Sequence, residues 1–180
     1  MSIDVILINP PLPHNSYSKE LVTQPLGLAY LAAVLEDACF SVKILDCPPL
    51  NYDFKDIKKY VEDLKPKLVG ISSTTLTINN ALRIAKIVKE ISPETKVFLG
   101  GPHASILDRE TLTSTDYVDG IVRGEGEITF LEVARKVKAK SPLNNTLGLT
   151  LKTKKGVIRF PDRALIEDLD SLPYPARHLL

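Results

Sequence analysis

The stretch KLVGISSTTLTINNALRIAKIVKEISPETKVFLGG, residues 67–101, decides the fold class. It begins with one short apolar run, KLVGIS (67–72), and ends with another, KVFLGG (96–101). Between them, residues 77–92 space their apolar side chains as an amphipathic helix does. A strand, a helix and a second strand in this order form a βαβ unit, whose two strands run parallel.

The same alternation extends in both directions from this unit. Further strands are predicted over residues 3–9 and 41–46 and within residues 116–124. Further helices are predicted over residues 25–38, 53–66 and 127–140, with a short one at 108–114. Right-handed crossovers place such helices on both faces of the sheet. The sequence therefore predicts an α/β protein with a Rossmann-like (flavodoxin-like) five-stranded parallel sheet.

The pattern changes after residue 145. Residues 146–160 predict a β-hairpin that turns at Lys154, Lys155 and Gly156. Residues 161–180 are acidic, interrupted by prolines, and without a helical or strand period, as in a linker. We expect a binding domain at 1–145, a hairpin and linker at 146–180, and a further domain beyond, so that the chain is part of a longer protein.

The composition limits the possible functions. The chain has 180 residues, of which 44% are hydrophobic, enough for one globular core. Its 23 basic and 22 acidic residues give a net charge of +1, and no basic block occurs, so no nucleic-acid partner is expected. No apolar run approaches the roughly 20 residues of a membrane helix, and the first strand is too short and acidic for a signal peptide. The two cysteines, Cys39 and Cys47, favour a reducing cytoplasm over a disulfide scaffold.

In parallel α/β sheets, ligands bind past the carboxyl ends of the strands, where the strand order reverses. One loop at this edge contains Gly100, Gly101 and His103, in the sequence GGPHAS. Glycines let a ligand approach the backbone closely, although a glycine pair is also common in an ordinary turn. Contact between His103 and a ligand is expected, but metal coordination is not.

Two more loops carry polar groups. In SSTTLT (72–77), small hydroxyl residues either bond a ligand or cap the next helix. In RGEGEIT (123–129), Gly124 and Gly126 leave N–H groups open near a helix N-terminus, which suits a phosphate or amide oxygen. Glu125 and Glu127 either cap that helix or accept hydrogen bonds from a ligand.

The loop after the first strand, NPPLPHNSYS (9–18), has prolines and no glycine turn. It lacks the Gly-x-Gly-x-x-Gly fingerprint of dinucleotide-binding proteins, and no Walker loop occurs in the chain. No zinc spacing and no catalytic triad can be assembled from its histidines, cysteines and carboxylates. A wide, stiff loop of this kind suits a ligand bulkier than a dinucleotide ring.

Taken in order, NPP, PLGLAYLAAVLE, GGPHAS, GEGE and LDSLPYPAR resemble one family. The chain is similar to the amino-terminal cobalamin-binding domain of cobalamin-dependent radical S-adenosylmethionine enzymes. That family includes the anaerobic magnesium-protoporphyrin monomethyl ester cyclases and many radical methyltransferases. The resemblance covers essentially the whole chain and implies that the corrin ring lies across the strand ends, with its nucleotide tail in the crevice between sheet and helices.

The resemblance also implies a set of cofactor-binding residues. Ser72, Ser73 and Thr74 stand where related domains have Ser-x-Leu, with Thr74 in place of the leucine. Gly100 and Gly101 match the Gly-Gly that lets the tail pass. The complete set is Asn9, Pro10, Pro11, Ser72, Ser73, Thr74, Gly100, Gly101, His103, Gly124, Glu125, Gly126 and Glu127.

No residue is assigned as a metal ligand. His14 is a candidate cobalt ligand, but its loop lacks the Asp-x-His-x-x-Gly of cobalamin proteins that coordinate through histidine. A histidine-off state is therefore expected. The radical half of such enzymes also needs a Cys-x-x-x-Cys-x-x-Cys motif for a 4Fe-4S cluster and S-adenosylmethionine. The two cysteines here cannot form it, so we expect that motif beyond Leu180, and this chain to carry cobalamin without catalysing the reaction alone.

Other functions remain open at this point. A flavodoxin-like or sugar-nucleotide-binding domain would use the same crevice, although NPP and PLPHNSYS form a poor phosphate loop. The crevice could also bind nothing until a second domain completes it. A signalling receiver is excluded, because the loops after the first and third strands lack its acidic cluster and its phosphorylatable aspartate.

Overall fold

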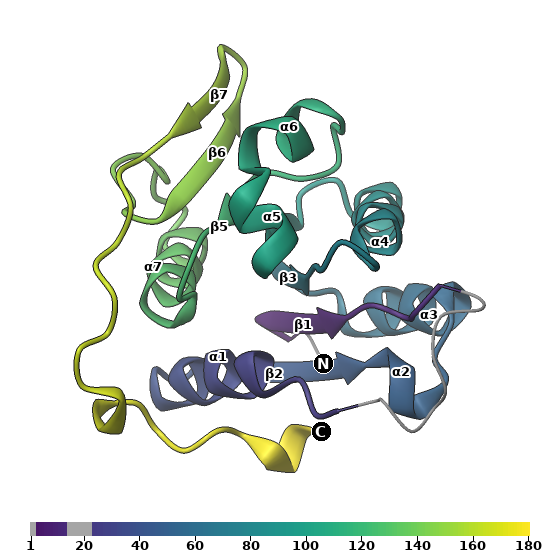
Figure 1. Cartoon of the computed structure of the whole chain (residues 1–180). Coiled ribbons are helices and arrows are strands. Elements are labelled where there is room, and N and C mark those ends of the chain that lie inside the picture. The colour runs from purple at the N-terminus through teal and green to yellow at the C-terminus, as the bar shows by residue number, and fades with distance from the viewer. Residues whose placement is uncertain (1–2, 14–22) are drawn as a thin grey trace.

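A computed structural model describes residues 3–13 and 23–180 of the chain. Its centre is a single seven-stranded sheet in the order β2-β1-β3-β4-β5-β6-β7, shown in Figure 1. Strands β1 to β5 pair in parallel, and β6 and β7 pair antiparallel. The strands are β1 (Val5–Asn9), β2 (Val42–Asp46), β3 (Leu68–Ser72), β4 (Lys96–Gly100), β5 (Gly120–Val122), β6 (Leu149–Thr153) and β7 (Gly156–Arg159).

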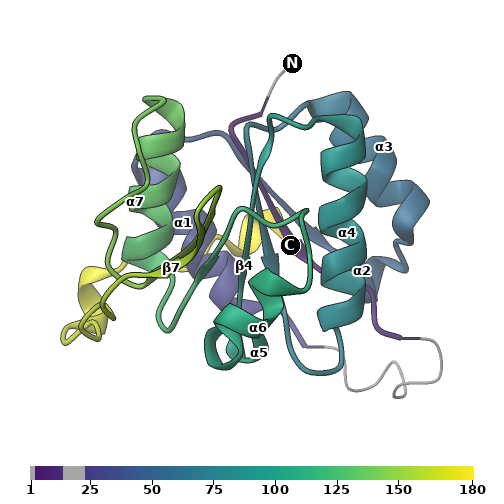
Figure 2. The same ribbon diagram turned by 90° about the horizontal axis from the view of Figure 1, so that it is seen from above.

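Helices cover both faces of the sheet, as Figure 2 shows. On one face, α1 and α7 pack over a core that includes Leu7, Phe98 and Phe130. On the other face, α3 and α4 pack over a core that includes Ile71 and Leu99. The helices are α1 (Leu26–Asp37), α2 (Cys47–Leu50), α3 (Phe54–Leu64), α4 (Ile78–Ile91), α5 (Pro102–Ile106), α6 (Asp108–Thr113) and α7 (Glu127–Lys138).

The predicted α/β class, parallel sheet and two helical layers are confirmed. The strands form because β-branched and other apolar residues are buried on both faces, as in Val5–Asn9. Helix α3 begins at a capping box in which the Asp53 side chain accepts from backbone N–H groups and Asp56 reciprocates. The strand order reverses between β1 and β3, so the edge where their carboxyl ends diverge is the place for a ligand.

The five predicted parallel strands and the C-terminal hairpin are confirmed, but the sheet has seven strands rather than five, because the hairpin adds β6 and β7 to it. Strand β6 pairs with β5, so that Ile121 lies opposite Thr150. Buried polar groups support this junction: Thr150 donates a hydrogen bond of 2.5 Å to Asp108 Oδ2 and accepts one from Arg123. The division of the chain into 1–145 and 146–180 stays a prediction.

The segment after β7 lies along the face formed by α7 and α1 (Figure 1). Arg163 pairs with Glu132 of α7 at 2.5 Å, and the Ala176 N–H donates to the Ala29 carbonyl of α1 at 3.0 Å. Ala176 itself is buried. Apart from two 3-10 turns, Leu169–Ser171 and Arg177–Leu179, the segment is irregular, as its proline spacing predicts.

Two short helices were not predicted. Helix α2 follows β2 directly, and α5 forms within GGPHAS, which the sequence indicated as a loop. Both start with proline at or next to their first position, where the missing N–H costs nothing. Of the helices in the described ranges, none is both long and apolar enough to cross a membrane.

Candidate cobalamin site

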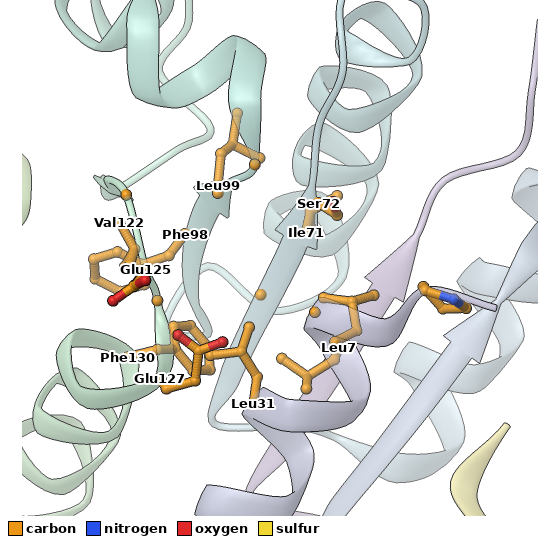
Figure 3. A pocket seen from close by; sticks show the side chains of 18 of the residues that line it. Leu7, Leu31, Ile71, Ser72, Phe98, Leu99, Val122, Glu125, Glu127 and Phe130 are labelled. Carbon is orange, nitrogen blue, oxygen red and sulfur yellow. The ribbon is translucent and has the colours of Figure 1, made fainter. Parts of the chain in front are cut away.

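A pocket of about 250 Å³ lies at the carboxyl ends of the central strands, between the sheet and helices α1 and α7 (Figure 3). It is smaller than most small-molecule sites, which span roughly 300–1,000 Å³. Its walls are apolar, apart from two glutamates and a serine. The lining residues are Leu7, Pro25, Leu26, Gly27, Leu28, Leu31, Gly70, Ile71, Ser72, Phe98, Leu99, Gly100, Gly101, Val122, Gly124, Glu125, Gly126, Glu127 and Phe130.

Glycine shapes two walls of this pocket. A Cβ built on Gly70, in the middle of β3, would lie 2.8 Å from Phe130 Cζ and 2.9 Å from Leu7 Cδ2. The bare backbone at Gly70 therefore lets these two side chains close over the sheet. On the first turn of α1, a Cβ added to Gly27 would have no atom within 4 Å, so the pocket stays open on that side.

The predicted Gly-Gly pair has two different roles. Gly101 has a φ of +88°, and a Cβ there would lie 2.6 Å from the Ser73 carbonyl oxygen. Gly101 must therefore be glycine because of the protein's own backbone. A Cβ on Gly100 would make only an ordinary contact of 3.6 Å with the Val122 carbonyl. The protein's own packing therefore does not require glycine here, and the missing side chain leaves space in the pocket.

The hydroxyl loop after β3 is used mostly by the protein itself. Ser73 is fully buried, and its hydroxyl donates to the Gly100 carbonyl at 2.8 Å. The Thr74 N–H donates to Thr77 Oγ1 at 3.0 Å, so Thr77 orders the loop and does not cap an N–H of α4. Ser72 lines the pocket at the end of β3. Of the three predicted residues in this loop, Ser72 is the one that faces the pocket.

The GEGE loop forms the opposite rim. Gly124 has a φ of +65°, and its N–H donates to Ser105 Oγ at 3.2 Å, so this N–H is not open as the sequence indicated. Glu125 accepts the Ile166 N–H at 2.7 Å and so contacts the C-terminal segment. Glu127 turns toward the pocket beside Leu31 and Phe130, as Figure 3 shows.

Glu127 has the most unusual environment in the pocket. Its Oε2 atom is buried and lacks a hydrogen-bond partner, and no other side-chain atom of the described residues shares this state. Burial raises the pKa of Glu127; the bond from its own backbone N–H works against this rise, and the charge of Glu125 adds to it. An orphaned polar atom in an apolar pocket points to a missing partner.

The remaining predicted residues lie outside this pocket. Asn9 donates to Asp46 Oδ1 at 2.8 Å, and the Pro11 carbonyl accepts from Asn80 at 2.8 Å. His103 lies in α5, with Nδ1 3.3 Å from Thr75 Oγ1. Pro10 is buried next to Asn9. His14 falls outside the described residues, and within residues 3–13 and 23–180 no group of three or more His, Cys, Asp or Glu could hold a metal.

Sequence reasoning missed part of the pocket. The wall from α1, Phe130 of α7 and the glycines at 27 and 70 were not assigned to the site. The isolated glycine of KLVGIS was the available signal, because a glycine inside a strand often marks a close approach of another group. Leu28 and Leu31 share a helical stripe that predicts burial but does not separate core from pocket.

Residues 18–134 match the family model described as "B12 binding domain". The chain belongs to this family. As a B12-binding domain, it has a pocket that fits part of the cofactor: an apolar crevice with glycine on its floor and an orphaned carboxyl oxygen on its wall.

This B12-binding domain is similar to several characterised or named proteins. It is 36% identical to an uncharacterized methyltransferase of Pyrococcus horikoshii, over 98% of this chain and 38% of that protein. It is 30% identical to the anaerobic magnesium-protoporphyrin IX monomethyl ester cyclase of Rubrivivax gelatinosus, over 82% of this chain and 28% of that protein. The chain thus spans well under half the length of these relatives.

Among solved structures, the cobalamin-dependent S-adenosylmethionine radical enzyme OxsB, with aqua-cobalamin and S-adenosylmethionine bound, has the same fold. The TM-score is 0.82 at 18% identity, over 97% of this chain and 24% of that one. The resemblance that the sequence motifs indicated is confirmed at the level of family and fold.

Proposed function

We propose that the chain binds cobalamin with the corrin ring across the carboxyl ends of β1, β3, β4 and β5 and with the nucleotide tail in the pocket beneath. The observation that supports this most is the size and position of the pocket. At about 250 Å³, it is too small for a corrin but suits one flat heterocyclic base. The pocket opens at the strand ends, where the small residues Ser72, Gly100 and Gly124 line its entrance.

The chain's own residues bind, orient and shield the cofactor. Apolar side chains such as Leu31 and Phe130 exclude water from the tail, and their burial against it stabilises the complex. The bare backbone of Gly100 lets the tail pass from the rim into the crevice. Cobalamin itself supplies a cobalt centre able to carry a methyl group. Asn9, Pro10, Pro11, Thr74 and His103 lie outside this pocket and are proposed to contact the corrin rather than the tail.

We further propose that the complete protein is a cobalamin-dependent radical S-adenosylmethionine enzyme. Its radical domain would follow residue 180 and would hold a 4Fe-4S cluster and S-adenosylmethionine. Both relatives named above are much longer than this chain, which leaves room for such a domain. Methyl transfer is favoured over oxidative cyclisation because the methyltransferase is the more similar of the two, at 36% against 30% identity. The free cysteines, Cys39 and Cys47, fit a reducing cytoplasm as the compartment.

Titration of the purified chain with hydroxocobalamin tests the binding proposal. The visible spectrum of the cofactor should change on binding, and the cofactor should co-elute with the protein in gel filtration. A chain that leaves the spectrum unchanged and elutes without cobalt would contradict the proposal. Tighter binding of flavin mononucleotide than of cobalamin would favour a flavodoxin-like function instead.

A further inference from the structure

Glu127 is a half-buried residue, but one of its carboxyl oxygens is buried in the pocket and has no hydrogen-bond partner. Glu127 is the first residue of α7, and its Oε2 atom is the buried side-chain oxygen without a partner in the described part of the chain. Leu31 and Phe130 flank it (Figure 3), and neither can form a hydrogen bond with it. Burying a polar atom without a partner is costly, so a ligand group that satisfies it explains why it is tolerated.

Two roles are open to a glutamate at this position. An ionised carboxylate at a helix N-terminus stabilises the helix through the helix dipole, and that interaction would lower the pKa of the group. The pKa of Glu127 is instead raised on balance: burial raises it most, the bond from its own backbone N–H lowers it, and the charge of Glu125 raises it further. Among the described residues, Glu125 is the one other titratable group that lines the pocket, and α1, β1 and β3 present apolar or small residues to it. No donor of the described residues faces Oε2 in this apolar wall, and burial disfavours the charged form, so the neutral acid, a hydrogen-bond donor, fits the site better than a helix-capping carboxylate.

We propose that Glu127, as the neutral acid, donates a hydrogen bond to a ring nitrogen of the heterocyclic base at the end of the cofactor's nucleotide tail. This inference rests on the proposed function, since it requires the tail to enter the pocket. The base has such a nitrogen free when it does not coordinate cobalt, and that nitrogen is an acceptor. Glu127 thus makes the pocket selective for corrinoids whose tail carries an acceptor nitrogen.

The selectivity follows from the surroundings of Glu127. An aromatic base of any kind can pack against the apolar side chains of Leu31 and Phe130, so the apolar contacts do not discriminate between bases. A base without an acceptor nitrogen, such as a cresol, leaves the Glu127 carboxyl unpaired in the complex. Rejection of a ligand that leaves a buried polar group unpaired is stronger than rejection by shape alone.

Binding of methylcobalamin, methylcobinamide and a cresol-tailed corrinoid to the chain tests the inference. Methylcobinamide lacks the nucleotide tail and serves as the ligand control. We expect Glu127→Leu to weaken methylcobalamin binding by about 10-fold and to leave methylcobinamide binding unchanged. Wild-type protein should bind methylcobalamin about 10-fold more tightly than the cresol-tailed corrinoid, and Glu127→Leu should abolish that preference.

The pH dependence provides a second readout that does not depend on the leucine variant folding. The affinity for methylcobalamin should fall as pH rises through the pKa of Glu127, because deprotonation removes the donor. In Glu127→Gln, whose amide donates at every pH, the affinity should stay close to the wild-type value at low pH and should not vary with pH. Glu125→Gln should move the wild-type midpoint to lower pH, because it removes a like charge. Glu62→Gln, on the exposed surface of α3, is the matched control and should change neither affinity nor midpoint.

Three results would overturn the inference. The first is an equal loss of methylcobalamin and methylcobinamide binding in the leucine variant, which would show a structural role. The second is an affinity that rises with pH, which would show that the ionised carboxylate is the binding form. The third is wild-type protein that binds the cresol-tailed corrinoid as tightly as methylcobalamin. Protein that binds neither methylcobalamin nor methylcobinamide would overturn the proposed function, and this inference with it.

Discussion

Gly101 lies directly against the backbone of Ser73, so that a Cβ on Gly101 would stand 2.6 Å from the Ser73 carbonyl oxygen and 2.9 Å from its nitrogen. The same two segments are joined by hydrogen bonds from Ser73 to the Gly100 carbonyl. This contact joins the ends of β3 and β4, beneath the proposed corrin position. Gly101 thus fixes the strand ends on which the corrin is proposed to lie, and Gly100 forms part of the pocket wall.

Substitution of Gly101 by alanine should destabilise the fold. The positive φ and the clash with Ser73 together should cost about 2–4 kcal/mol in the free energy of unfolding. Gly124→Ala is the control, because Gly124 also has a positive φ but has no atom within 4 Å of its Cβ position. It should cost only about 1–2 kcal/mol. Urea unfolding monitored by circular dichroism measures both, and equal costs would contradict the close contact.

Alanine in place of Gly27 should have the opposite effect on stability. Gly27 lies in the first turn of α1, and a Cβ there meets no atom within 4 Å. Alanine should therefore stabilise the protein by about 0.5–1 kcal/mol, since glycine weakens a helix by that amount. A rise in the thermal unfolding midpoint is the expected result. A fall would show that the space beside Gly27 is too tightly packed to accept a methyl group.

The stability of the protein should decrease at low pH because of Asp108. Burial raises the pKa of Asp108, but hydrogen bonds from Thr150, Arg159 and the Arg109 N–H, together with the charge of Arg159, hold the pKa below its usual value. A carboxyl whose folded pKa is depressed stabilises the fold above its unfolded pKa of about 3.9, and that contribution is lost as pH falls through the folded value. Urea unfolding between pH 7 and pH 3 should show this loss.

Asp108→Asn should remove the acid-sensitive contribution and lower stability at pH 7 by about 1–3 kcal/mol, because the charged acceptor of the hydrogen bonds from Thr150 and Arg159 is lost. The exposed Asp37→Asn should change stability by less than about 0.5 kcal/mol. Asp37→Asn should keep the pH dependence of wild-type protein. If Asp108→Asn keeps it as well, the Asp108 network does not stabilise the junction between β5 and β6.

The two cysteines should differ sharply in reactivity. Cys39 is exposed, whereas Cys47 is fully buried. Burial, followed by the nearby charges of Asp46 and Asp56, raises the pKa of Cys47 to about 12. Iodoacetamide at pH 8 should therefore alkylate Cys39 in the folded protein and spare Cys47 until the chain is unfolded. Mass spectrometry of the labelled peptides measures this. Equal labelling in the folded state would contradict the burial of Cys47.

The sequence was enough to predict the layers of the fold, because strands buried on both faces leave continuous apolar runs such as VILIN at Val5–Asn9. It could not predict that the hairpin joins the sheet, because that depends on the pairing of Ile121 with Thr150, which are far apart in the chain. The polar partners Arg123 and Asp108 satisfy Thr150 only after folding.

The candidate site could likewise be predicted only in part. Motifs placed Gly100, Gly124 and Glu127 at the strand ends, where parallel strands bring them together. The opposing contacts were invisible, since nothing in the sequence shows that Gly101 meets Ser73 or that Gly70 meets Phe130. For the same reason, the sequence does not show that Glu125 contacts the C-terminal segment whereas Glu127 turns into the pocket.

Blocking the pocket from Gly27 tests the central claim, that the nucleotide tail of cobalamin enters the crevice between the sheet and helices α1 and α7. The measurement is the ratio of dissociation constants for methylcobinamide and methylcobalamin, in wild-type protein and in Gly27→Phe. We expect wild-type protein to favour methylcobalamin by at least about 10-fold and the phenylalanine variant, with its pocket filled, to bind both ligands equally. An unchanged preference for methylcobalamin in a folded Gly27→Phe protein would show that the tail binds elsewhere.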